Sequence, residues 1–124
     1  MIHLKRGTAL ALALFATAAP HLLPPQAAAF SAADLATFTK ERKCIGCDLR
    51  GADFKGQDLR AVVLEGALLI GANFEGANLE DAFMEDCSLE EANLTGANLT
   101  GAGLDGATWT DGRTCGSDSV GICK

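Results

Sequence analysis

The sequence contains no tyrosine and only two histidines, His3 and His21. Both histidines lie within the first 29 residues, which have the features of a signal peptide described below. Without that segment the chain has no imidazole, which excludes a histidine base, a Ser-His or Cys-His nucleophile and a histidine metal ligand. The sequence therefore predicts a protein that is not an enzyme and that holds no cofactor.

Basic residues are also scarce, with 10 Lys and Arg against 16 Asp and Glu. Removal of the first 29 residues would take away Lys5 and Arg6 but no acid, leaving a net charge of −8 on 95 residues. Residues 61–112 contain ten acids and no base. Because an acidic surface repels the phosphate backbone, we expect no nucleic-acid partner.

The amino-terminal segment resembles a secretory signal peptide. Lys5 and Arg6 precede an apolar run, residues 8–19, and Ala27-Ala28-Ala29 has the small-x-small pattern of a cleavage site. A retained anchor needs about 20 apolar residues, and prolines interrupt this run. We therefore expect residues 1–29 to be removed on export, and the mature chain to have no membrane attachment.

A repeat with a period of five covers residues 47–111. If each unit is written x-x-centre-x-x, all thirteen centres are large and apolar. These centres are Leu49, Phe54, Leu59, Leu64, Leu69, Phe74, Leu79, Met84, Leu89, Leu94, Leu99, Leu104 and Trp109. The residue two positions before the centre is alanine in nine of the thirteen units. A helix requires a period near 3.6 and a strand a period near 2, so a different element must form.

A square coil accounts for this period if each unit forms one side and one corner. Every centre then points inward, beside the small residue that stands two positions before it. Glycine ends many units, and it suits a corner that needs a positive φ. Gln57 and Val62 occupy inward small positions of the first coil, so we expect the Gln57 amide to bond to backbone.

The units Ala52-Asp53-Phe54-Lys55-Gly56, Ala72-Asn73-Phe74-Glu75-Gly76 and Ala92-Asn93-Leu94-Thr95-Gly96 resemble the A-(D/N)-L-x-x motif of the pentapeptide-repeat family. The resemblance implies an all-β fold, the right-handed quadrilateral β-helix, with four repeats per coil. It also implies the periplasm as destination, or the thylakoid lumen if the source is photosynthetic. Some acidic members of the family mimic DNA and occupy the DNA site of type II topoisomerases. That alternative function is disfavoured here, because those members are cytosolic and generally longer.

The segments that flank the repeats are expected to close the ends of the coil. Residues 30–46 are predicted to form a capping helix and a C-x-x-C linker, with Ser31 as N-cap and Asp34 as a capping-box variant. The helix is predicted to run to about Lys43. Residues 112–124 are predicted to form a carboxy-terminal capping tail.

The five cysteines form three groups. Cys115 and Cys123 bracket the tail, where an oxidising compartment favours a disulfide. Cys44 and Cys47 follow a helix rather than precede one, which disfavours a low thiol pKa and a redox function; a local disulfide or a core position for Cys47 remains open. Cys87 is predicted to be a buried free thiol. The terminal pairs lie at opposite ends of the coil, so we expect no zinc site.

Two further patterns have ordinary explanations. Gly101 to Gly106 spell G-x-G-x-x-G, but no βαβ unit surrounds them, so we interpret these glycines as repeat corners. Glu65, Glu85 and Asp105 recur at intervals of 20 and form an acidic ladder on one side. Such a ladder is solvated or binds a cation, and the sequence leaves both interpretations open.

Four apolar residues stand at outward positions where the repeat expects polar ones. Val63 and Phe83 are predicted to stack on one side of the coil, and Leu68 and Ile70 to lie on the next side. A contiguous exposed apolar patch is typical of a binding surface, whereas scattered residues need no explanation. We therefore predict a monomeric, non-catalytic structural or protein-interaction module with an unknown protein partner. A cysteine-based redox or metal-binding role is a further alternative.

Overall fold

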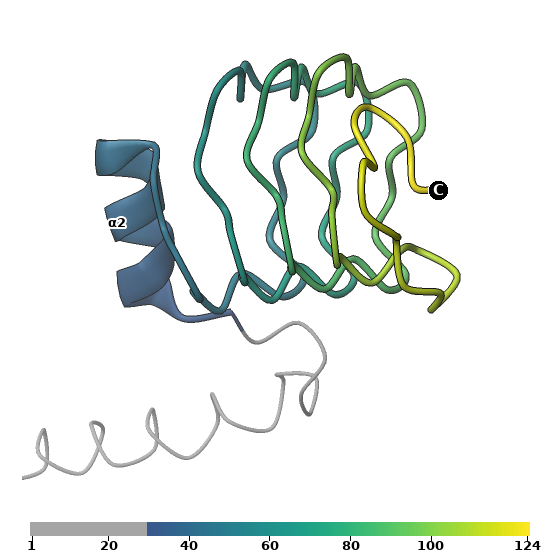
Figure 1. The fold of residues 1–124 in the computed structure, drawn as a ribbon. Helices are drawn as coiled ribbons and strands as arrows, with labels where there is room; N and C mark the ends of the chain where they lie inside the picture. Colours follow the sequence, from purple (N-terminus) through teal and green to yellow (C-terminus); the bar gives the residue numbers. More distant parts are fainter. Residues whose placement is uncertain (1–29) are drawn as a thin grey trace, which may run out of the picture.

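The computed structural model describes residues 30–124, and the predicted signal peptide lies outside the described residues. From residue 43 onward the backbone winds into stacked coils (Figure 1). Every parallel bridge joins residues that are 20 apart in the sequence, as Val63 is bridged to Phe83. Four five-residue units therefore complete one coil.

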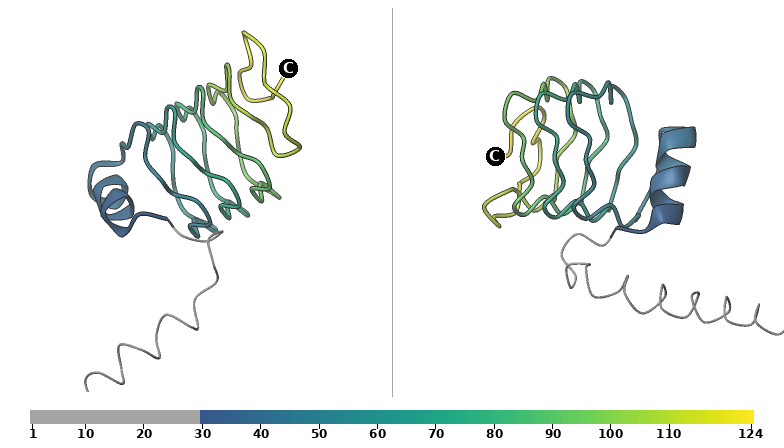
Figure 2. Two further views of the ribbon diagram at one scale, coloured as in Figure 1. Left: turned by 90° about the horizontal axis from the view of Figure 1, so that it is seen from below. Right: turned by 180° about the vertical axis from the view of Figure 1, so that it is seen from behind.

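The coil has four sides, which we number by the residues that are bridged along each of them. Side 1 contains Lys43, Val63, Phe83 and Gly103; side 2 contains Asp48, Leu68, Ser88 and Thr108; side 3 contains Asp53, Asn73 and Asn93; side 4 contains Asp58, Asn78 and Asn98. These contacts are isolated parallel bridges rather than long strands. The coils stack along one axis, with the amino-terminal helix at one end and the tail at the other (Figures 1 and 2).

The core consists of the inward columns that the period of five predicts. The most deeply buried side chains include Leu49, Leu64, Leu69, Phe74, Leu79, Met84, Leu89 and Leu104. Ala77, which precedes Leu79, is 1% exposed, so the small residue lies inside as expected. Val62 is also buried, but the prediction for Gln57 is wrong, because Gln57 is exposed at the open edge of the first coil.

The corners require a left-handed backbone, which explains the glycines that end many units. Gly66 and Gly96, for example, have φ values of 66° and 71°. Three consecutive corners nevertheless place an acid in this conformation, at Asp81, Asp86 and Glu91. Positive φ is unfavourable for most residues other than glycine, asparagine and aspartate.

The Asp or Asn before many centres stabilises the corner that follows. Its Oδ1 accepts the N–H group of the residue two positions later, as Asn73 Oδ1 does from Glu75 N at 3.0 Å. Asp53, Asp58, Asn78, Asn93 and Asn98 make the same contact. This Asx turn gives a physical reason for the second residue of the motif.

Helix α2, Ala32–Glu41, covers the first coil. Ser31 is its N-cap, as predicted, since Ser31 Oγ accepts the N–H of Asp34 at 3.2 Å. Phe38 is buried and meets Phe54 edge-on, with ring centroids 5.6 Å apart. Phe54 in turn stacks on Phe74 at 5.1 Å, so an aromatic column joins the helix to the core.

Two predictions about this cap are wrong. The helix ends at Glu41 rather than near Lys43, because Arg42 adopts a left-handed C-cap with φ 57°. Asp34 forms no capping box, because Asp34 Oδ2 accepts the N–H of Asp48 at 2.8 Å, and Ser31 N donates instead to Asp48 O at 2.9 Å. The Asp34 carboxylate therefore accepts a hydrogen bond from the backbone of the first coil rather than from its own helix.

Arg42 also completes the backbone hydrogen bonding of the first coil. Inside the stack, a centre residue donates its N–H to the next coil, as Leu49 does to Leu68 O at 2.9 Å. No coil precedes the first one, and Arg42 supplies the missing donors through Nη1 to Asp58 O at 3.1 Å and Nη2 to Arg60 O at 2.7 Å. The exposed edge of the solenoid is thereby partly paired.

The tail folds back on the last coil as an antiparallel segment. It bridges Gly103 through Val120 and Thr108 through Thr114. Cys115 and Cys123 are joined by a disulfide, and both are buried. Among residues 30–124, no helix has the length and apolarity that a membrane span requires.

Candidate functional site

The outward column of side 1 contains the main part of the predicted apolar surface. Val63 and Phe83 lie on adjacent coils, held by bonds from Leu64 N to Phe83 O at 2.7 Å and from Phe83 N to Val62 O at 2.8 Å. Phe83 is 47% exposed and Val63 is half-buried. The predicted stacking of these two residues is therefore present in the structure.

Side 2 contributes the other two predicted residues. Leu68 is 37% exposed and Ile70 is half-buried. Leu68 is bridged on one edge to Asp48 and on the other to Ser88, so its neighbours along the column are polar. Side 2 is thus less continuous in its apolar character than side 1.

The tail adds an apolar residue that the sequence analysis did not include. Val120 is bridged to Gly103, which is itself bridged to Phe83, and Val120 is 58% exposed. The outward column of side 1 therefore runs through Val63, Phe83 and Gly103 to Val120. Ile122 is also exposed, at 61%. The tail lies outside the five-residue period, so the period gives no signal for these two residues.

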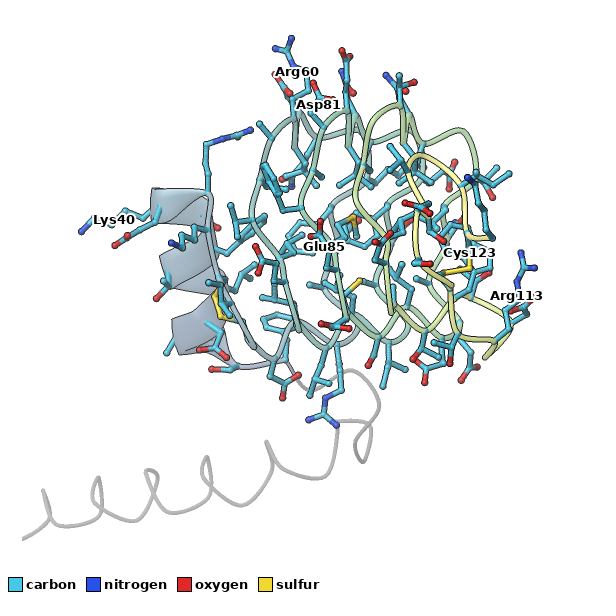
Figure 3. The ribbon with its side chains drawn as sticks, viewed as in Figure 1. Lys40, Arg60, Asp81, Glu85, Arg113 and Cys123 are labelled. Atoms are coloured by element: carbon cyan, nitrogen blue, oxygen red, sulfur yellow. A yellow bond between two sulfur atoms is a disulfide. The ribbon has the colours of Figure 1, made fainter. Side chains whose placement is uncertain are left out.

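The acidic ladder follows side 1, but its three members are in different environments. Glu65 is exposed. Glu85 lies midway along the stack, with a carboxylate oxygen where a side chain at Gly103 would stand (Figure 3). Asp105 Oδ1 accepts the N–H of Ser119 at 2.8 Å, which anchors the tail. The interpretation of Asp105 as a merely solvated ladder residue is therefore incomplete.

Cys44 and Cys47 are joined in the structure and connect the end of the helix to the first coil. Both are buried, and Cys47 occupies the inward column next to Leu49. Their sulfurs and an oxygen of Asp34 lie within 4.8 Å of one another, a group with the spacing of metal ligands in the described chain. Because the two sulfurs are bonded to each other, they are not thiolate ligands in this state.

Cys87 is a free thiol, fully buried in the inward column of side 2. Burial raises the pKa of the Cys87 thiol to about 12, and the nearby acid Glu85 acts in the same direction. The thiol therefore stays protonated and is a poor nucleophile near neutral pH.

Two Arg–Asp pairs lie on the outside of the first coil. Arg60 binds Asp58 through both Nε and Nη2, the latter at 2.7 Å, and this hydrogen bonding lowers the pKa of Asp58 to about 2. Arg50 binds Asp48 in the same bidentate way and also lowers the pKa of that carboxyl. These contacts pair Arg50 and Arg60 with acids, whereas Lys40 extends from α2 away from the coil (Figure 3).

A groove of about 360 Å³ lies between α2 and the first coil. Its lining residues are Leu35, Phe38, Thr39, Arg42, Asp53, Phe54, Gln57, Asp58, Leu59 and Val62. Arg42 is the basic residue among those that line this groove. Two of its nitrogens already donate to the carbonyls of Asp58 and Arg60. The groove is therefore a consequence of how the helix caps the coil.

The geometry defines a four-sided β-solenoid of five-residue repeats with a helical cap and a disulfide-closed tail. The sequence matches the family "Pentapeptide repeats" in eight copies, over residues 47–86 and 72–108, which together make up half of the chain. The chain belongs to the pentapeptide repeat family, and this membership implies the right-handed quadrilateral β-helix. A comparison with curated proteins gives no significant match.

Two solved structures illustrate the likeness. HetL, a pentapeptide repeat protein involved in heterocyst differentiation regulation in the cyanobacterium Nostoc, is 34% identical with a TM-score of 0.53, and the alignment covers 58% of this chain and 34% of HetL. A pentapeptide repeat protein from the thylakoid lumen of Arabidopsis thaliana is 38% identical with a TM-score of 0.45, over 52% of this chain and 41% of its own. The chain thus spans well under half the length of either relative.

Proposed function

We propose that the mature chain is a non-catalytic, extracytoplasmic protein that acts as a structural or protein-interaction module through side 1. The observation that carries this proposal is the outward apolar column of side 1, in which Phe83 and Val120 are 47% and 58% exposed. Exposed aromatic and aliphatic residues on a rigid scaffold are typical anchors of a protein interface. The partner is a protein, and the chain itself acts as a monomer.

The chemistry of the chain supports a binding role over catalysis. The part that follows residue 29 has no histidine, and Cys87 is held as a protonated, buried thiol. Its acidic surface disfavours nucleic acid, and the apolar segment with a cleavage pattern before residue 30 supports export to the periplasm or, in a photosynthetic source, to the thylakoid lumen.

The test is affinity capture from the compartment of export with the wild-type protein and with the double variant Val63→Ser and Phe83→Ser. We expect the variant to lose specific partners while its thermal unfolding changes little, because both residues point outward. The control is Thr37→Ser on the exposed face of α2, which lies outside side 1 and should retain every partner. If the double variant captures the same proteins as the wild type, side 1 is not the interface.

A further inference from the structure

The end of the solenoid opposite α2 is covered on two sides out of four. The tail forms antiparallel bridges to Gly103 on side 1 and to Thr108 on side 2. Sides 3 and 4 end with residues 92–96 and 97–101, and no described segment is bridged to them from beyond. The tail touches only the end of side 4, where Gly121 lies against the backbone of Leu99, Thr100 and Gly101. The centres of these two units, Leu94 and Leu99, are partly exposed, whereas the corresponding Leu104 of side 1 is fully buried.

The backbone of this edge has unused hydrogen-bonding groups. Inside the stack, Leu79 donates its N–H to Asn98 O at 2.7 Å, and Ala77 accepts at its carbonyl from Asn98 N at 2.9 Å. The equivalent groups of the last coil that the tail leaves uncovered have no partner in the described part of the chain: the N–H groups of Leu94, Gly96 and Leu99, and the carbonyls of Ala92 and Ala97. Such a row of unpaired groups is a template for another strand.

The tail shows what this edge accepts. On side 1, Leu104 N donates to Ser119 O at 2.8 Å, and Gly121 N donates back to Ala102 O at 2.8 Å. Side 2 has the same arrangement between Trp109 N and Arg113 O and between Cys115 N and Ala107 O. Each pair uses a centre N–H and the carbonyl two residues before it. On sides 3 and 4 the centre N–H and the carbonyl two residues before it make no hydrogen bond to another residue within 30–124. These sides can therefore pair with an antiparallel strand in the same way.

Charge and size define the strand that fits. Glu90 and Glu91 immediately precede the edge, Glu80 lies on the coil next to it, and Arg113 of the tail already pairs with Asp111 at 3.5 Å. A second copy would bring the same acids to the contact, whereas a segment with Lys or Arg would complement them. Where the tail caps the coil, its buried residues are small, as Ser119 is. A small or short apolar side chain therefore suits the space above Leu94 and Leu99.

We propose that residues 92–101 bind an extended, basic segment of a protein partner by antiparallel strand addition. The segment donates N–H groups to the carbonyls of Ala92 and Ala97 and accepts from the N–H groups of Leu94 and Leu99. Its alternate side chains cover the two leucines, while its bases face the acids around the edge. This binding edge is separate from the apolar column of side 1, and its test does not depend on that surface.

The probe is a short blocked peptide of alternating lysine and valine, titrated into the purified protein and followed by amide NMR and hydrogen exchange. We expect the amides of Leu94, Gly96 and Leu99 to shift and to exchange more slowly when the peptide is bound. The same peptide N-methylated at alternate residues keeps its charge but loses its donors, and it should not bind. Equal binding of the methylated peptide would overturn strand addition. Protection of the same amides in a peptide-free dimer would show that a second copy occupies the edge.

Paired variants locate the binding. Thr95→Lys places a base beside the free edge of side 3, whereas Thr110→Lys makes the same change on side 2, where the tail occupies the edge. We expect Thr95→Lys to weaken the peptide roughly two- to fivefold, the scale of one surface charge contact. Thr110→Lys and Phe83→Ser should leave the affinity unchanged. An equal loss in Thr95→Lys and Thr110→Lys would show that the peptide responds to overall charge, and the proposal would fail.

Discussion

Sides 3 and 4 differ from side 1, and from side 2 beyond its first level, in the outward residue that precedes each centre. Among the described residues of side 2, only Asp48 accepts the N–H two residues later, from Arg50 at 3.3 Å. On sides 3 and 4 this residue is Asp or Asn at every level, and each one accepts the N–H two residues later. On side 1 the column is Lys43, Val63, Phe83 and Gly103, none of which can make that bond. The centres behind all four sides are large apolar residues. The comparison teaches that the core determines the fold, while the outward positions are free to be used for binding.

The largest loss of stability should come from a substitution in the core, on any of the four sides. Leu79 of side 4 is 0% exposed, so Leu79→Ala should leave a cavity and lower the free energy of unfolding by about 2 to 5 kcal/mol. Glu80→Ala, one residue later and directed outward, should change it by less than about 0.5 kcal/mol. Thermal and denaturant unfolding of both variants measure the difference. Equal damage from the two changes would show that the assignment of inward and outward residues is wrong.

Replacing a small inward residue by a larger one should be the next most harmful change. Ala77 lies beside Leu79 and is 1% exposed, so Ala77→Leu should overpack the core and destabilise the protein by about 1 to 3 kcal/mol. Ala61→Leu is the control, because Ala61 is exposed at a corner. Its positive φ of 56° is unfavourable for alanine in the wild type and for leucine in the variant alike. We expect the midpoint of denaturant unfolding to fall clearly more for Ala77→Leu.

The contrast between the two pairs of sides can be tested directly at the Asx position. Asn73→Ala on side 3 removes the acceptor for Glu75 N and should reduce stability by about 0.5 to 1.5 kcal/mol. Ser88→Ala is the control, since Ser88 holds the same position on side 2 and makes no side-chain bond among the described residues. Urea unfolding that showed the same loss for both variants would remove the distinction between the sides.

The smallest effect concerns the exposed pair of Asp58 and Arg60. The pKa of Asp58 is lowered from 3.8 to about 2 by the hydrogen bond from Arg60, so the pair stabilises the fold above pH 3.8. That stabilisation is lost as the pH falls from 3.8 to about 2, because Asp58 then takes up a proton in the folded state. Arg60→Gln should return the pKa toward 3.8, as measured by carboxyl NMR. Arg50→Gln, which affects Asp48 instead, should leave the pKa of Asp58 unchanged.

The repetitive part of the molecule can be predicted well from the sequence, because every unit has the same pattern of inward and corner positions. Leu49, Leu79 and Leu104 lie inward as the period requires, and the glycine corners have the expected positive φ. The capping role of Ser31 was also predictable, because a local sequence motif signals it. The exposed position of Phe83 followed from its place in the unit.

The ends of the coil were predicted less well because no repetition describes them. Asp34 bonds to Asp48 rather than to its own helix, and this contact depends on how the helix docks. Gln57 has an inward position in the period, but the first coil is open beside α2 and the amide is exposed. The antiparallel return of the tail, which brings Val120 onto side 1, is likewise a tertiary contact.

The twenty-residue coil has a consequence for how such a chain can gain or lose repeats. Deletion of one unit, such as residues 72–76, would keep every later centre pointing inward, because all four sides have the same inward pattern. It would rotate all later outward residues by a quarter turn, so Phe83 would leave the column of Val63 and take the place of Asn78 on side 4. Deletion of four units would preserve every column. Natural variation in length is therefore expected to be tolerated by the core in steps of five residues, but by a binding surface in steps of twenty.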